Sequence, residues 1–173
     1  MRRALALVAL GLLLGCGDVS REVAPETKTC LRSLEIKPGY TPVELYGSMA
    51  KCASEQRMLE AVDLFAHAFA FASFDARRVR DARAPALLGA LPLTHTAALP
   101  EADREALYAA LEEMGKPGSE ASTRVCTDLR RLGPPTYVPE YLSDQGIDVQ
   151  EASDGFDARK AWDEVLAGPL RCG

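Results

Sequence analysis

The apolar residues between positions 58 and 72 recur at the spacing of one face of an α-helix, and this run most restricts the fold that the chain can adopt. The face consists of Met58, Ala61, Val62, Phe65, Phe69 and Ala72. Four of the five phenylalanines fall between positions 65 and 74. Because a helix with so continuous an apolar face must bury it, we expect this segment to be the central helix of the core.

A second helix is predicted immediately before it, over residues 42–52. Thr41, Pro42 and Glu44 supply a capping hydroxyl, a first-turn proline and a glutamate three residues after the cap. Residues 42–72 resemble one tetratricopeptide-type helical hairpin, whose packing positions match Leu45, Met49, Cys52, Ala61, Phe65 and Ala68. The glycine usual in such repeats is missing, and the pattern does not recur along the chain. Arrays of these repeats generally need three or more copies for stability. We therefore expect a plain antiparallel hairpin.

The rest of the chain also has helical patterns, and no run of alternating residues predicts strands. Helical segments are expected at 75–83, 84–91, 100–114, 119–132 and 157–167, the last of them capped by Asp157. Residues 134–156 are predicted to be irregular, with a turn at 139–143, and residues 93–98 to form a loop. The fold class predicted from this pattern is all-α, a single small domain of six or seven helices.

The first fifteen residues have the pattern of a secretory signal peptide. Arg2 and Arg3 precede residues 4–14, which are uncharged and apolar. This run is shorter than the roughly 20 residues of a membrane-spanning helix, and its charged start is typical of a signal peptide.

The run ends in Leu13-Leu14-Gly15-Cys16, which resembles the lipobox of bacterial lipoproteins. The resemblance implies cleavage after Gly15 and acylation of the Cys16 thiol by two or three chains, enough for a durable anchor. Leu14 departs from the smaller residue usual at its position. The residue after Cys16 is Gly17, whereas the resemblance implies an aspartate at this position in lipoproteins that are retained in the inner membrane of enteric bacteria. We therefore expect a lipoprotein facing the periplasm, on the outer membrane rather than the inner one.

These signals divide the chain into residues 1–15 as signal peptide, 16–29 as lipidated cysteine and flexible tether, and 30–173 as the helical domain. Removing the signal peptide leaves 158 residues, with 18 basic and 25 acidic side chains and a net charge of −7. Binding to nucleic acid rests on neutralising phosphates. The charge therefore argues against nucleic acid as a partner.

Four cysteines remain after Cys16, and an even number in an exported chain predicts two disulfides. Three pairings of Cys30, Cys52, Cys126 and Cys172 can be drawn. We favour Cys30–Cys52 with Cys126–Cys172, because the turn after Lys37 folds an extended segment back along the helix that ends at Cys52. The rival interpretation, a metal site, lacks any CxxC or CxH spacing.

No catalytic set, metal site or cofactor motif is recognisable. The sequence contains no HExxH, GxSxG, P-loop or GxGxxG. His67 and His95 lack a ligand or nucleophile at a meaningful spacing, so we interpret His67 as a partly buried core residue and His95 as a surface residue.

Two segments are candidates for contact with a partner. Arg77, Arg80 and Arg83 share one side of a helix and could bind anions such as lipid headgroups, or form a solvated face paired with nearby aspartates. Tyr137 and Tyr141 lie in a proline-rich loop that either binds a partner or covers the helical core.

The function predicted from these features is that of an anchored periplasmic protein that contacts other proteins without catalysis, as an envelope accessory or assembly factor. One specific alternative is an immunity protein against a periplasmic toxin. An alternative of another class is a peptidoglycan hydrolase using late carboxylates, which are Asp144, Asp148, Glu151, Asp154 and Asp157.

Overall fold

The computed structural model describes residues 29–116, 118–150 and 155–173. Six α-helices and three short 3-10 helices form there, with no strand in those ranges. The helices are η1 (Ser33–Glu35), α1 (Pro42–Ser54), α2 (Met58–Arg78), η2 (Ala84–Ala86), α3 (Leu87–Thr96), α4 (Glu101–Met114), α5 (Glu120–Leu132), η3 (Glu140–Gln145) and α6 (Ala158–Ala167). The predicted all-α class with two disulfides is confirmed. The predicted signal peptide, Cys16 and the predicted tether up to residue 28 lie outside the described residues.

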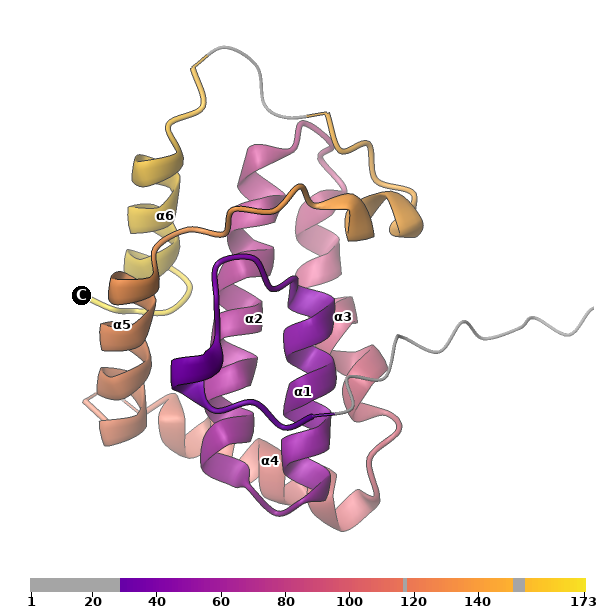
Figure 1. The fold of residues 1–173 in the computed structure, drawn as a ribbon, viewed down its shortest axis with the longest axis vertical. Helices are drawn as coiled ribbons and strands as arrows, with labels where there is room; N and C mark the ends of the chain where they lie inside the picture. Colours follow the sequence, from indigo (N-terminus) through magenta and orange to yellow (C-terminus); the bar gives the residue numbers. More distant parts are fainter. Residues whose placement is uncertain (1–28, 117, 151–154) are drawn as a thin grey trace, which may run out of the picture.

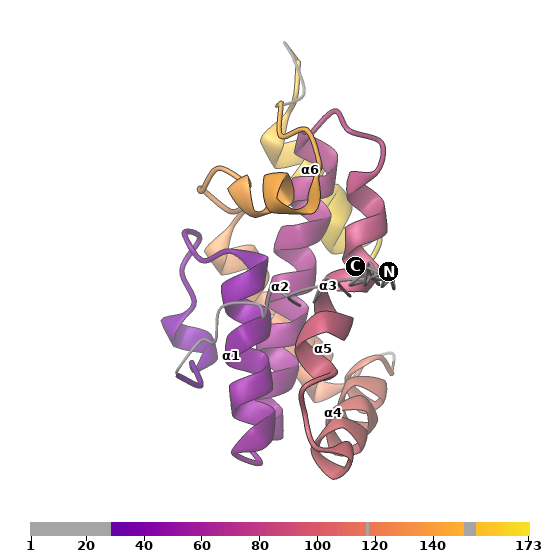
Figure 2. The same cartoon turned by 90° about the vertical axis from the view of Figure 1, so that its right-hand side faces the viewer.

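Helix α2 is the centre of the fold, as its long apolar face predicts. Helices α1, α3, α4, α5 and α6 all pack against it, and Figures 1 and 2 show them surrounding it. Alanines at positions 61, 66, 68, 70 and 72 are buried, and their small side chains let neighbouring helices approach closely. The largest fully buried side chains include Tyr46, Phe71 and Leu64.

Helices α1 and α2 form the antiparallel hairpin that the sequence predicts. Helix α1 begins with the expected capping box, in which the Glu44 amide donates to Thr41 Oγ1 (3.3 Å) and the Glu44 carboxylate accepts from the Thr41 amide (2.7 Å). Gln56 lies in the turn between the helices with a φ of 60°. The hairpin therefore rests on a strong local start and on burial of both inner faces.

The prediction for residues 84–98 is wrong in its boundaries. Instead of a helix ending near Leu91 and a loop, α3 continues to Thr96 and contains Pro92. Leu91, His95 and Thr96 are buried on its inner side. Burial of these side chains outweighs the local helix-breaking preference of proline, which removes one backbone donor. Similarly, residues 139–143 are not a lone turn, because η3 extends over six residues.

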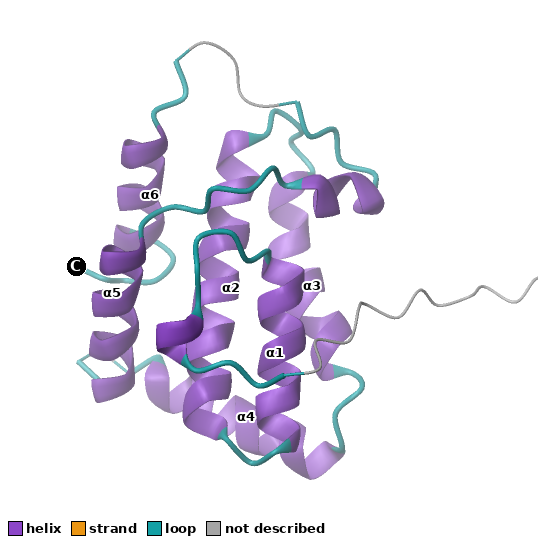
Figure 3. Ribbon diagram, viewed as in Figure 1, coloured by secondary structure: helices purple, strands orange, loops and turns teal. Residues whose placement is uncertain are grey.

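Helices α5 and α6 close the domain on the far side of α2 (Figure 3). The Lys160 amide donates to Asp157 Oδ1 (3.0 Å), so Asp157 caps α6 as predicted. Trp162 packs at 6.0 Å, between ring centroids, from both Phe71 and Phe74. The second disulfide, Cys126–Cys172, fastens the end of the chain to α5.

Candidate functional site

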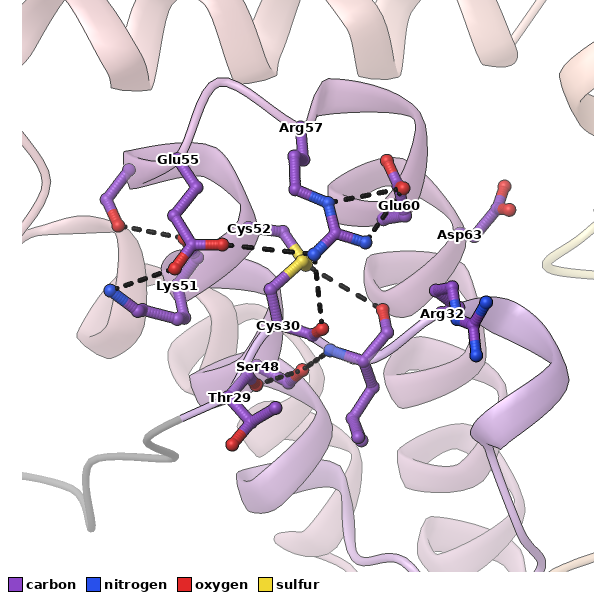
Figure 4. The surroundings of a disulfide bond; sticks show 12 residues. Thr29, Cys30, Arg32, Ser48, Lys51, Cys52, Glu55, Arg57, Glu60 and Asp63 are labelled. Carbon is purple, nitrogen blue, oxygen red and sulfur yellow. Dashed lines mark hydrogen bonds and ion pairs between the residues drawn. A yellow bond between two sulfur atoms is a disulfide. The ribbon is translucent and has the colours of Figure 1, made fainter.

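The first described residues are fastened to the helical hairpin at one junction, drawn in Figure 4. Cys30 and Cys52 form a disulfide with a Cα–Cα distance of 4.7 Å. Ser48 donates from Oγ to the Thr29 carbonyl and accepts from the Leu31 amide, both at 2.9 Å. The chain is therefore held to α1 from the first residue that the structure describes.

Charged side chains surround this junction and connect it to α2. Arg57 Nη1 donates to the Cys30 carbonyl (3.4 Å), while Nη2 pairs with Glu60 (2.9 Å). Lys51 and Glu55 form a further ion pair at 3.1 Å. Such partly exposed pairs individually add little stability, so the disulfide and the Ser48 hydrogen bonds are the main attachments of the chain to α1.

Asp63 joins three elements close to the junction. Its buried carboxylate accepts from Ser33 Oγ of η1 (2.5 Å) and from both Nε and Nη2 of Arg124 on α5 (3.1 and 2.7 Å). A carboxylate that accepts from a guanidinium fork is held in a fixed geometry. The arrangement therefore positions η1 and α5 on α2 and leaves no free carboxylate oxygen for chemistry.

Both predicted histidines are buried. His67 was expected in the core, and its Nδ1 lies 2.7 Å from the Asp63 carbonyl. The interpretation of His95 as a surface residue is wrong, because α3 continues through it and places its ring 6.0 Å from that of Tyr46. Burial lowers the pKa of each imidazole, which favours the neutral form.

The three arginines predicted to form one cluster do not share a common partner in the structure. Arg77 donates to the Ser73 carbonyl one turn earlier (2.8 Å). Arg83 binds Asp81 and the Gly146 carbonyl (2.7 Å), which holds the end of η3 against the turn after α2. The Arg80 side chain is exposed and bonds to none of the residues that the structure describes. Of the three arginines predicted to contact a partner, Arg80 is therefore the one whose side chain is not already bound within the described part of the chain.

The predicted tyrosine loop folds back over α2. The hydroxyls of Tyr137 and Tyr141 both donate to Asp75 Oδ2, at 2.7 and 2.8 Å. Val138, between them, is 59% exposed. The loop is therefore a cover for the core, which is one of the two interpretations that the sequence left open, and its hydroxyls point inward.

Asp75 and Arg78 are buried, whereas one interpretation of the sequence placed the arginines and aspartates of this segment on a solvated face. Asp75 is fully buried and forms an ion pair with Arg78 at 2.8 Å. The Arg78 guanidinium also lies over the rings of Tyr137 (5.2 Å) and Phe74 (5.6 Å). The signal was present in the sequence, since Asp75 and Arg78 continue the helical spacing of Phe71 and Phe74 onto the buried side.

Burial raises the pKa of Asp75 to about 6, although Arg78 and the two tyrosine hydroxyls act in the opposite direction. Burial also raises the pKa of Tyr137 and Tyr141, so both remain donors. A buried carboxylate with an altered pKa can mark a catalytic group. Here both carboxylate oxygens contact side chains of the fold. We therefore interpret the cluster of Asp75, Arg78, Tyr137 and Tyr141 as a structural latch, which holds the tyrosine loop on α2.

No group of three or more His, Cys, Asp or Glu residues that could hold a metal ion occurs in the described ranges. None of the helices found there has the length and apolarity needed to cross a membrane. Along α6 lies an open hollow of about 480 Å³, lined by exposed charged side chains that include Arg159 and Asp163. Its walls come from one helix alone.

Comparisons with family models, with curated proteins and with solved structures find no match.

Proposed function

We propose that the protein is a membrane-anchored periplasmic lipoprotein whose helical domain acts as a non-enzymatic contact module for other envelope proteins. The observation that carries the proposal is the pairing of cysteines. Four of the five cysteines pair with one another in the domain, and the fifth, Cys16, follows the lipobox-like Leu13-Leu14-Gly15.

The two disulfides support maturation outside the cytoplasm, since such bonds persist in oxidising compartments. With its neighbours paired, Cys16 is the residue left for acylation. Two or three acyl chains bind a membrane durably, whereas one chain binds it only marginally. This chemistry explains how a domain made of short amphipathic helices would be held at a membrane.

The contact function is supported by how the polar side chains are used. Asp63 and Asp75 each bind several donors from neighbouring elements. Asp157, one of the late carboxylates proposed for a hydrolase, caps α6. Among the described residues, the outer surface of the helices is therefore what remains available for a partner.

The anchor is tested by Cys16→Ser in the native host. We expect the variant to incorporate no radiolabelled palmitate and to accumulate as the uncleaved precursor, whereas the matched Gly17→Ala variant is labelled and processed normally. Equal labelling of Cys16→Ser and the wild type would disprove lipidation at this residue.

The contact function is tested by crosslinking the native lipidated protein in cells, followed by purification and mass spectrometry. We expect one envelope protein at constant stoichiometry, and capture of a toxin encoded beside the gene would identify the immunity protein alternative. Release of fragments from purified sacculi by the oxidised protein, abolished by Asp144→Asn or Asp148→Asn, would instead establish the hydrolase.

A further inference from the structure

The surface of α3 differs chemically from the rest of the molecule. Residues 84–100 contain no Asp, Glu, Lys or Arg, although 26% of the chain is charged. The only ionisable side chain in the segment, His95, is turned into the core. An uncharged helix is normally covered on all sides, yet in this domain α3 lies at the surface, where Figure 2 shows it facing the viewer.

The outer face of α3 is an exposed apolar surface. Leu93 is 62% exposed and projects from the middle of the helix. Gly89, Ala90 and Ala97 are also exposed and follow the same helical face. Thr94 lies at its edge, where its hydroxyl donates to the Ala90 carbonyl (3.2 Å), so this face offers almost no polar group to solvent.

Gly89 adds an independent observation. A Cβ at this position would have no heavy atom within 4 Å, and its φ is outside the left-handed region. Glycine in a helix is less stable than alanine, and nothing in the domain requires it. Gly89 therefore adds no polar group to the outer face of α3, and the space around it accepts a larger apolar side chain.

The start of the domain is bound to a helix that packs against α3. Thr29 is bound to Ser48 of α1, and α1 packs directly against α3 (Figures 1 and 2). Between Cys16 and Thr29 the chain can span at most about 45 Å. A tether of this length gives the domain a high effective concentration at the membrane, so a weak contact is sufficient to keep one face docked.

We propose that the outer face of α3 docks on the surface of the membrane that holds Cys16, with Leu93 inserted at the boundary between headgroups and acyl chains. This inference rests on the proposed lipid anchor. Arg80, exposed in the turn between α2 and η2 that precedes α3 in the chain, is the cation that would contact lipid phosphates. The apolar face supplies the contact, and the tether keeps the domain within reach.

The test uses the full lipidated chain in vesicles of phosphatidylcholine with brominated acyl chains, which quench tryptophan on contact. Leu93→Trp places the probe on the proposed face. Leu59→Trp is the matched control, because Leu59 is an equally exposed helical leucine (69%) at the start of α2. Trp162 is buried and contributes the same background to both.

We expect bromolipid to quench Leu93→Trp at least about twofold more than Leu59→Trp. Including phosphatidylglycerol should increase the difference, and Arg80→Ala should remove that increase. Gly89→Leu in the Leu93→Trp chain should keep or strengthen the quenching, since a membrane accepts a larger apolar side chain. Equal quenching of the two probes in protein that floats with the vesicles would overturn docking while leaving the anchor intact.

Two other results have separate meanings. Failure of the protein to float with the vesicles would contradict the lipid anchor rather than the docking face alone. A blue shift of Leu93→Trp in the unlipidated mature chain (residues 16–173 carrying Cys16→Ser), together with dimerisation in sedimentation and its loss with Gly89→Leu, would identify a second copy of the chain as the occupant and overturn the membrane proposal.

Discussion

Asp75 is the residue at which burial and charge are most closely balanced. Its carboxylate is fully buried, and moving a carboxylate out of water is unfavourable unless it is paired and hydrogen-bonded. Arg78 and the hydroxyls of Tyr137 and Tyr141 supply those partners. Because burial still raises its pKa to about 6, the ionised form is only partly compensated.

This balance predicts a specific pH dependence of stability. The pKa of Asp75 is about 6 in the folded protein, above its ordinary value of 3.8, so between these values the folded state binds more protons than the unfolded one. Its contribution to the free energy of unfolding must then fall by about 3 kcal/mol in total as the pH rises from about 3 to about 7, with about 2 kcal/mol of that decline between pH 4 and 6. Asp75→Asn should remove this decline.

The measurement is urea unfolding of wild type and variant between pH 4 and 7, followed by circular dichroism. Carboxylates with lowered pKa values, such as Glu60, change stability in the opposite direction. The difference between the two proteins therefore isolates Asp75. Asp144→Asn, which alters an exposed carboxylate of η3, should leave the slope unchanged, and a parallel slope in Asp75→Asn would refute the assignment.

At the scale of elements, the helices with local start signals could be predicted closely. Thr41 and Asp157 cap α1 and α6 at the expected residues, and glycine ends α5 at Gly133. The boundaries of α3 could not be predicted, because they depend on burial against α1 and α2 rather than on local sequence. Residues 93–98 were predicted to form a loop, whereas tertiary contacts extend α3 to Thr96.

Two glycines give opposite predictions for the same substitution. Gly89 lies within α3 with space for a Cβ, so Gly89→Ala should raise the free energy of unfolding by about 0.5–1 kcal/mol. Gly133 has a φ of +77° at the end of α5, where alanine is strained, so Gly133→Ala should lower it by a similar or larger amount. Thermal and urea unfolding test both, and destabilisation by Gly89→Ala would show that the glycine serves the fold.

At the scale of the molecule, the two disulfides fasten the two ends of the domain. Cys30–Cys52 holds the first described residues to α1, and Cys126–Cys172 holds the last ones to α5. This framework could be predicted, because an even cysteine count indicates two disulfides and one turn signal favours the observed pairing among the three. The Asp75 latch could not be predicted, because Tyr137 and Tyr141 are separated from Asp75 by 62 and 66 positions in the sequence. Only the folded chain brings them together.

The disulfides also predict that the domain depends on oxidation for its stability. The paired cysteines are 22 and 46 residues apart. In the chain-entropy model, closing loops of these lengths stabilises a protein by about 3 and about 4 kcal/mol. Their sum is comparable with the whole stability of an ordinary domain, about 5–15 kcal/mol. Urea unfolding of the reduced protein should therefore show a much lower midpoint than that of the oxidised protein.

Variants in which one pair is replaced separate the two contributions. Cys126→Ala with Cys172→Ala should lose more stability than Cys30→Ala with Cys52→Ala, because it opens the longer loop and frees the end that follows α6. A domain with this dependence would fold poorly in a reducing cytosol and well after export. Equal unfolding midpoints for the reduced and oxidised proteins would remove the main structural support for a compartment outside the cytoplasm, whatever the fate of Cys16.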